Sequence, residues 1–226
     1  MITQATVAVT PREPALLGQA VVVIGGSAGI GLETARHARA EGADVILTAR
    51  NPDRLQRAAA ELGARGTAAF DAIDPDALDR FFANLPGPID HVMITGPGPY
   101  YAPLADLDRE RAHRDFDDHT WLAIAVAQHA AGRVRPGGTL VFMGGTGGRS
   151  RGPGLSLIAA GFVDTPLSAS LLGDDLDARR AQLRAMLPIG RVVGPADIAA
   201  LAVHLMTNTA VTGATYDIDG GQQLTA

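Results

Sequence analysis

The sequence predicts an α/β fold: a Rossmann-like, doubly wound parallel sheet with helices on both faces. Two observations predict it. Short apolar runs alternate with helical patterns along most of the chain, which is typical of βαβ units. A glycine-rich stretch also separates the first apolar run from the first helical pattern. This order of elements places buried strands beneath two layers of helices.

Five apolar runs are expected to be strands, and four helical patterns are expected to cross between them. The expected strands are residues 19–24, 44–48, 66–70, 91–95 and 139–143, and the expected helices are residues 28–41, 52–62, 75–84 and 109–132. Asp74 and Asp108 are the expected caps of the third and fourth helices. Two later helices are expected over residues 167–187 and 195–207, and a last strand over residues 214–218. Residues 1–18 are expected to form an N-terminal leader with a short edge strand at 6–10, and residues 19–226 a single dinucleotide-binding domain.

Composition excludes several classes of function. The 226 residues include no cysteine, so disulfides and thiolate chemistry are excluded. The net charge is −5 and the 19 basic residues, all arginine, are scattered, which argues against a nucleic-acid or membrane partner. No signal peptide, membrane-spanning run or metal-ligand spacing is recognised, so a cytoplasmic protein without a metal is expected.

The glycine-rich stretch GGSAGIG predicts a dinucleotide site rather than a purely structural turn. It lies between an expected strand and an expected helix, where backbone N–H groups and the helix dipole face a phosphate. The residues expected to contact the cofactor are Gly25, Ser27, Ala28, Gly29, Ile30 and Gly31.

The end of the second expected strand favours NADP over NAD. An acidic residue there would bind the ribose 2′-hydroxyl of NAD, but Ala49 is neutral and Arg50 and Asn51 follow it. A guanidinium suits a 2′-phosphate, although a solvated surface arginine is the alternative interpretation. A methyltransferase, which uses a similar loop, would also be expected to carry an acid here.

These residues resemble the short-chain dehydrogenase/reductase family over about residues 16–160 and 161–223. VIGGSAGIG is similar to its TGxxxGIG loop, and Asp71, with Ala72 beside it, matches the aspartate near the adenine. ITGP stands where the family has NNAG, which implies a backbone role for Gly96. GFVDTP resembles part of the family's PGxxxTP segment, which implies that Val163 and Thr165 lie near the nicotinamide carboxamide, and GATYDIDGGQQL resembles the usual last strand and tail.

The catalytic set that the resemblance implies is incomplete. In the family a Tyr delivers a proton, a Lys lowers the pKa of that Tyr, a Ser holds the carbonyl oxygen and an Asn supports a water relay. His119 stands at the Asn position, and Gly145, with Thr146 beside it, at the Ser position. The Tyr-x-x-x-Lys motif is missing, and the chain contains no lysine. His119 and Thr146 are the candidate catalytic residues, but an ion pair with a neighbouring aspartate and a turn cap are the alternative roles.

The junction between Ala160 and Gly161 is abrupt. In the family, some thirty to forty residues separate the helix start that resembles SLIAA from the segment that resembles GFVDTP. We therefore expect residues 155–160 to begin a helix whose remainder, together with one central strand, is absent. The segment is either deleted from the protein or missing from the sequence. The same helix usually packs in the family's oligomer interface, so the resemblance leaves a homo-oligomer open.

The sequence leaves two functions open. The first is an NADP(H)-dependent oxidoreductase acting on a small carbonyl or alcohol substrate, with Tyr100 and Tyr101 near the substrate or packing their own loop. The alternative is a catalytically impaired NADP-binding module that serves as a cofactor sensor or partner subunit.

Overall fold

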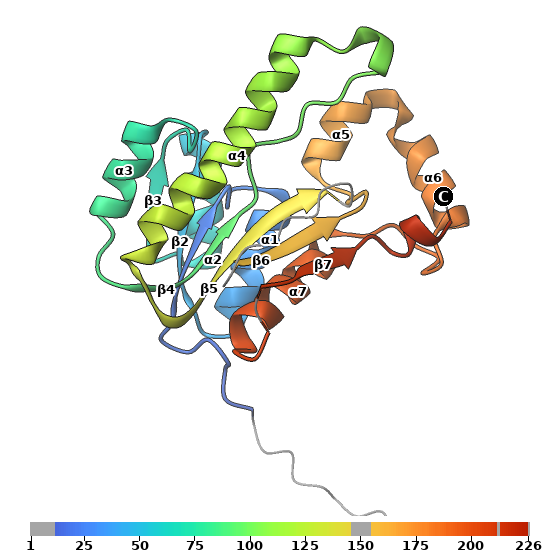
Figure 1. Cartoon of the computed structure of the whole chain (residues 1–226). Helices are drawn as coiled ribbons and strands as arrows, with labels where there is room; N and C mark the ends of the chain where they lie inside the picture. The colour runs from blue at the N-terminus through green and yellow to red at the C-terminus, as the bar shows by residue number, and fades with distance from the viewer. Residues whose placement is uncertain (1–11, 146–154, 212, 226) are drawn as a thin grey trace, which may run out of the picture.

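A computed structural model describes residues 12–145, 155–211 and 213–225, which form a Rossmann-like α/β fold around one parallel sheet (Figure 1). The sheet has seven strands in the order β3-β2-β1-β4-β5-β6-β7. This confirms the predicted fold class. The strands are β1 (Ala20–Ile24), β2 (Asp44–Ala49), β3 (Gly66–Ala69), β4 (Ile89–Ile94), β5 (Val134–Gly145), β6 (Leu155–Ala160) and β7 (Thr215–Ile218). The α-helices are α1 (Gly29–Ala40), α2 (Pro52–Leu62), α3 (Pro75–Ala83), α4 (Arg109–Ala131), α5 (Pro166–Leu172), α6 (Leu176–Met186) and α7 (Pro195–Thr207).

The sheet separates two apolar cores. The helices α1, α2 and α7 cover one face, where Val23, Met93 and Ile158 are buried. The helices α3 and α4 cover the other face, where Val92, Ile94 and Phe142 are buried. Among the described helices, none lies over β6 and β7 on the face that carries α4, so these strands are seen unobstructed by any helix in Figure 1. Among the described helices, only α7 therefore covers β6, and it does so from the other face.

One expectation is wrong. Residues 155–160 do not begin a helix, and the central strand that was expected to be absent is present. Leu155–Ala160 forms β6, which pairs in parallel with β5 from Leu140↔Leu155 to Gly145↔Ala160 and with β7 on its other side. A six-residue apolar run fits a buried strand as well as a helix start. The nine residues between Gly145 and Leu155 span about 30 Å when extended, which suffices to return along a six-residue strand. The run becomes the strand because β7 would otherwise lack a neighbour.

Other boundaries also differ from the predictions. The single helix expected over residues 167–187 is divided into α5 and α6, with Gly173 at φ +51° where α5 ends. The strand expected over residues 139–143 is longer, because β5 begins at Val134 and its pairing with β4 shifts register between Ile89 and His91. The edge strand expected at residues 6–10 lies outside the described residues.

A buried histidine lies on β4, at the end of the sheet away from the glycine loop. The His91 side chain is almost fully buried, and its Nε2 lies 2.7 Å from the Gln19 Oε1. Its Nδ1 has no hydrogen-bond partner among the described residues. Burial lowers the pKa of His91 from 6.5 to about 4, although the nearby Asp90 carboxylate opposes the shift. His91 is therefore neutral in the folded protein at neutral pH.

We expect the protein to lose stability in mild acid, because unfolding allows His91 to take up a proton. Its folded pKa lies below its unfolded pKa, so the unfolded state binds the extra proton and stability falls as the pH falls from 6.5 to about 4. The loss has a ceiling of about 3 kcal/mol, since each pKa unit corresponds to ~1.4 kcal/mol. Urea unfolding at several pH values should show a shallower dependence in His91→Gln than in the wild type.

The exposed His204 on α7 offers the matched control. His204→Gln should keep the wild-type dependence of the unfolding free energy on pH. Equal slopes for His91→Gln and the wild type between pH 4 and 6.5 would contradict the assignment of the acid sensitivity to His91.

Candidate cofactor and active site

The loop between β1 and α1 requires glycine for steric reasons. Gly25 has φ +92°, and a Cβ there would lie 2.5 Å from the Thr95 Oγ1 at the end of β4. A Cβ on Gly31 would lie 2.4 Å from the Gly25 carbonyl oxygen. The first turn of α1 therefore packs directly on the loop, and a ligand can approach the backbone closely.

The N-terminus of α1 has the properties of a phosphate site. Its N-cap residue, Ala28, makes no side-chain capping bond, and its first turn contains no acidic residue. By contrast, α2 is capped by Asn51 and carries Asp53 in its first turn. Uncapped N–H groups and the positive end of the helix dipole suit the diphosphate of a dinucleotide. The residues present therefore fit a dinucleotide cofactor.

Two arginines stand where β2 meets α2. Arg50 is exposed directly after β2, and Asn51 caps α2 by accepting a 2.8 Å hydrogen bond from the Arg54 backbone N–H. The Arg54 guanidinium donates from Nε to the Oγ of the buried Ser27 at 3.1 Å, which ties α2 to the glycine loop. Sequence reasoning missed Arg54. Its position on the expected helix, about one turn after Arg50, was a signal that could have identified it.

The other residues predicted to bind the cofactor follow the carboxyl ends of β3, β4 and β6. Asp71 and Ala72 are half-buried after β3, and the Asp71 Oδ1 accepts a hydrogen bond from the Ile73 N–H at 3.3 Å. Gly96 follows β4, and a Cβ there would meet open space. Because parallel strands share one carboxyl edge, these residues lie along the same edge as the glycine loop.

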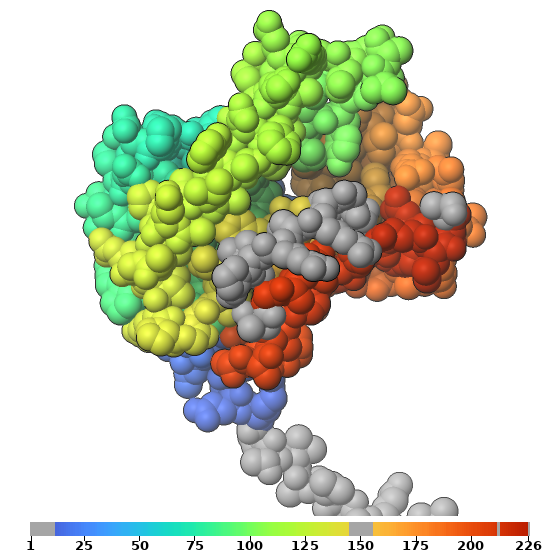
Figure 2. All heavy atoms as spheres, in the orientation of Figure 1, coloured from blue at the N-terminus to red at the C-terminus, as the bar shows by residue number. Residues whose placement is uncertain are grey.

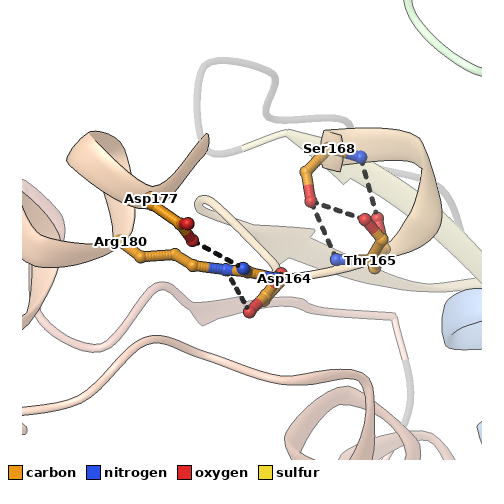
Figure 3. Close-up of polar contacts among 5 residues, drawn as sticks. All are labelled: Asp164, Thr165, Ser168, Asp177 and Arg180. Atoms are coloured by element: carbon orange, nitrogen blue, oxygen red, sulfur yellow. Dashed lines mark hydrogen bonds and ion pairs between the residues drawn. The ribbon is translucent and has the colours of Figure 1, made fainter. Parts of the chain in front are cut away.

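The segment after β6 reaches the glycine loop. A Cβ on Gly29 would lie 3.6 Å from the Thr165 Cβ, whereas Val163 is buried and bridges to Val193. The Thr165 Oγ1 accepts from the Ser168 N–H, and the Thr165 N–H donates to the Ser168 Oγ, forming a capping box for α5 (Figure 3). Thr165 is therefore held beside α1 by its own helix cap.

An ion pair fixes the residue before Thr165. The Arg180 guanidinium on α6 donates to both carboxylate oxygens of Asp164, at 2.9 and 2.8 Å, and to Asp177 at 3.0 Å (Figure 3). The two aspartates raise the pKa of Arg180. This bidentate contact links α6 to the segment that approaches the glycine loop.

His119 lies on α4 and lines a cavity at the carboxyl ends of β4 and β5. The other lining residues are Ile94, Gly96, Leu122, Ala123, Phe142, Met143 and Leu157. The His119 Nδ1 lies 2.7 Å from the Asp115 carbonyl oxygen and 3.6 Å from its carboxylate, and Nε2 lies 3.1 Å from the Pro97 carbonyl oxygen. The predicted alternative, a contact with an aspartate, is thus present, but the imidazole also faces the cavity.

Of the remaining candidate site residues, two do not line the cavity and one lies outside the described residues. The Tyr100 hydroxyl accepts from the Asp108 N–H, and the Arg111 guanidinium lies over the Tyr100 ring at 4.3 Å, so Tyr100 packs its own loop. Tyr101 is exposed. Thr146 lies outside the described residues. Within the described ranges, no three histidine or acidic side chains gather as metal ligands, and no helix is long and apolar enough to cross a membrane.

Comparisons with known proteins agree with this geometry. The family model of the short chain dehydrogenases matches residues 19–161, and that of the enoyl-(acyl carrier protein) reductases matches residues 154–223. The 3-oxoacyl-[acyl-carrier-protein] reductase of Escherichia coli (strain K12) is 25% identical over 249 residues, covering 92% of this chain and 98% of the relative. The alignment is longer than this 226-residue chain, so the relative carries residues that this chain lacks.

Two solved structures have the same fold. MalC reductase/Diels-Alderase from Malbranchea aurantiaca has a TM-score of 0.83 at 22% identity and covers 94% of this chain and 99% of its own. BdcA in complex with NADPH has a TM-score of 0.78 at 23% identity, with 91% and 95% covered. The chain belongs to the short-chain dehydrogenase/reductase family, whose members are oxidoreductases that bind nicotinamide cofactors.

Removal of the Arg180 side chain is expected to weaken cofactor binding without a direct contact. Arg180→Gln releases Asp164 and loosens Thr165 beside Gly29, so the dissociation constant for the reduced cofactor should rise about threefold to tenfold, as partly exposed ion pairs allow. Fluorescence titration with stopped-flow dissociation measures the change.

The control for this variant is Arg184→Gln, which removes an exposed arginine one turn further along α6. It should leave the cofactor affinity unchanged. An unaltered affinity and dissociation rate in Arg180→Gln would show that the ion pair does not position the segment.

Proposed function

We propose that the protein is a cytoplasmic, NADP(H)-dependent oxidoreductase of the short-chain dehydrogenase/reductase type that acts on a small carbonyl or alcohol substrate. The observation that carries the proposal is a pair of arginines, Arg50 directly after β2 and Arg54 in the first turn of α2, where no acidic residue ends β2. Arg50 is exposed beside the loop, and Arg54 donates to Ser27 within it. Two guanidinium groups suit the 2′-phosphate that distinguishes NADP from NAD.

The position of Arg54 adds a physical argument for an anion. It lies in the first turn of α2, where the positive end of the helix dipole disfavours a cation. A bound phosphate would reverse that penalty, because it would interact favourably with the guanidinium and the helix terminus together. The NADPH complex of BdcA, a protein of the same fold, is consistent with this choice.

His119 supplies the proton in the proposed reaction. When bound, NADPH supplies the hydride that is transferred to the carbonyl carbon. The His119 imidazolium donates its proton to the carbonyl oxygen, giving the alcohol, and neutral His119 then recovers a proton from solvent. His119 is suited to this role by its position, because it lines the cavity at the carboxyl ends of β4 and β5.

The second candidate is a binding module without turnover, and the absence of lysine from the chain favours it. Incubation with NADPH and a panel of ketones and aldehydes separates the two functions. Consumption of NADPH supports the oxidoreductase, whereas binding without consumption overturns it and favours the module. No binding of NADPH contradicts both.

The two arginines give a prediction about cofactor choice. Arg50→Gln and Arg54→Gln should each weaken NADPH binding by about tenfold, as expected for loss of one charge-assisted contact, and should leave NADH binding nearly unchanged. Isothermal titration with both cofactors measures the ratio. Arg57→Gln, on the same helix and also exposed, should change neither affinity. Equal losses for NADPH and NADH would argue against a 2′-phosphate site.

His119 gives a prediction about turnover. His119→Gln keeps a polar side chain but removes the acid, so kcat should fall about a hundredfold or more while NADPH affinity is retained. The acid limb of the pH–rate profile should also change shape, which a purely structural role would not cause. An unaltered kcat and pH profile would exclude His119 as the proton donor.

A further inference from the structure

The cavity beside α4 is apolar apart from one side chain. Leu122 and Ala123 line it from α4, Phe142 and Met143 from β5, and Leu157 from β6. Among the described residues that line it, His119 alone is titratable. Gly96, which is predicted to contact the cofactor, lines the cavity, so a molecule in the cavity would lie beside the predicted cofactor site.

The lining opposes a charged ligand. Among the described residues, no arginine lines the cavity, and a carboxylate moved from water into such surroundings without a partner costs several kcal/mol. The nearest described carboxylate to the imidazole is that of Asp115, whose negative charge would repel an acidic ligand further. One hydrogen-bonding group on an otherwise apolar wall suits a ligand with one polar atom.

The surroundings of the cavity are also apolar. Figure 2 shows a hollow between α4 with the loop before it, in green, and α5, in orange. The loop and α5 are in contact, since a Cβ on Gly98 would lie 3.4 Å from both Leu167 methyl carbons. Large side chains are exposed on these segments at Tyr101, Leu104, Leu107, Phe116, Leu167 and Leu171. These residues do not line the cavity itself, but exposed apolar side chains on the segments beside it are consistent with an apolar ligand.

We infer that the substrate is an uncharged, apolar carbonyl compound. Its hydrocarbon body lies against Leu122, Phe142 and Leu157, and its carbonyl oxygen faces His119. The inference rests on the proposed function, because it names the class of substrate for that site.

A matched pair of ligands tests this class. 2-Octanone and 7-oxooctanoate share a methyl ketone and chain length and differ only in a terminal methyl group or carboxylate. Saturation-transfer NMR on the NADPH-loaded protein should show that 2-octanone binds at least about tenfold more tightly, since the carboxylate must lose its hydration. This readout does not require turnover, and NADPH binding is measured separately on the same sample.

Variants of the wall locate the ligand. Ala123→Phe fills the cavity and should abolish 2-octanone binding, whereas Ala131→Phe, at an exposed site on the same helix, should not. Leu157→Arg places a cation on the half-buried β6 position and should invert the preference in favour of 7-oxooctanoate. Because inversion is a gain of binding, it remains informative even if Ala123→Phe fails to fold.

The outcomes are distinguishable. NADPH binding together with equal affinity for the two ligands, or with no binding of 2-octanone, overturns the substrate class and leaves the proposed function intact. Failure to bind NADPH overturns the proposed function, and the inference with it. Selective binding of 2-octanone with the two variant effects supports the inference.

Discussion

The parallel pairing of β6 between β5 and β7 is the constraint on which the site depends. It places the end of β6 at the same edge of the sheet as the end of β1, so that Thr165 lies beside Gly29. The exit from β6 is crowded, because a Cβ on Gly161 would lie 2.7 Å from the Asp219 Cβ in the turn after β7. A slip of one residue in this register would move the buried Ile158 to the opposite face of the sheet. Burial of Ile158 therefore helps to fix the segment that meets the glycine loop.

The short connection between β5 and β6 explains why no described helix covers these strands beside α4. Parallel neighbours are ordinarily joined by a dozen or more residues, usually including a helix, but here only nine residues join them. Among the described elements, none replaces that helix over β6 and β7, and Leu157 remains only partly buried. In the family this helix carries the Tyr and Lys. The Tyr-x-x-x-Lys motif is accordingly absent from the chain.

From the sequence alone, the edge of the sheet that carries the predicted cofactor residues could be placed, whereas the surroundings of His119 could not. The glycine loop, Arg50 and Asp71 could be placed from strand order, because parallel strands bring their carboxyl ends to one edge whatever their loops contain. Arg54 and Arg180 were missed, because their roles depend on how α2 and α6 pack, which local patterns do not specify. Leu155–Ala160 was misassigned because a short apolar run is decided by its neighbours in the sheet and not by its own periodicity. His119 was found through the family motif, but only the structure showed its second carbonyl neighbour.

The proposed cofactor site and the proposed proton donor lie on different parts of the fold. The glycine loop and α2 can bind a dinucleotide without any contribution from α4, so loss of the Tyr and Lys does not imply loss of binding. His119 connects the two parts, because Nε2 contacts the Pro97 carbonyl in the loop that follows β4. A neutral imidazole can donate to only one of its two carbonyl neighbours, so transfer of a proton to substrate weakens one contact and reprotonation restores it. In the proposed reaction, proton transfer from His119 therefore affects a contact with the loop beside the predicted cofactor site.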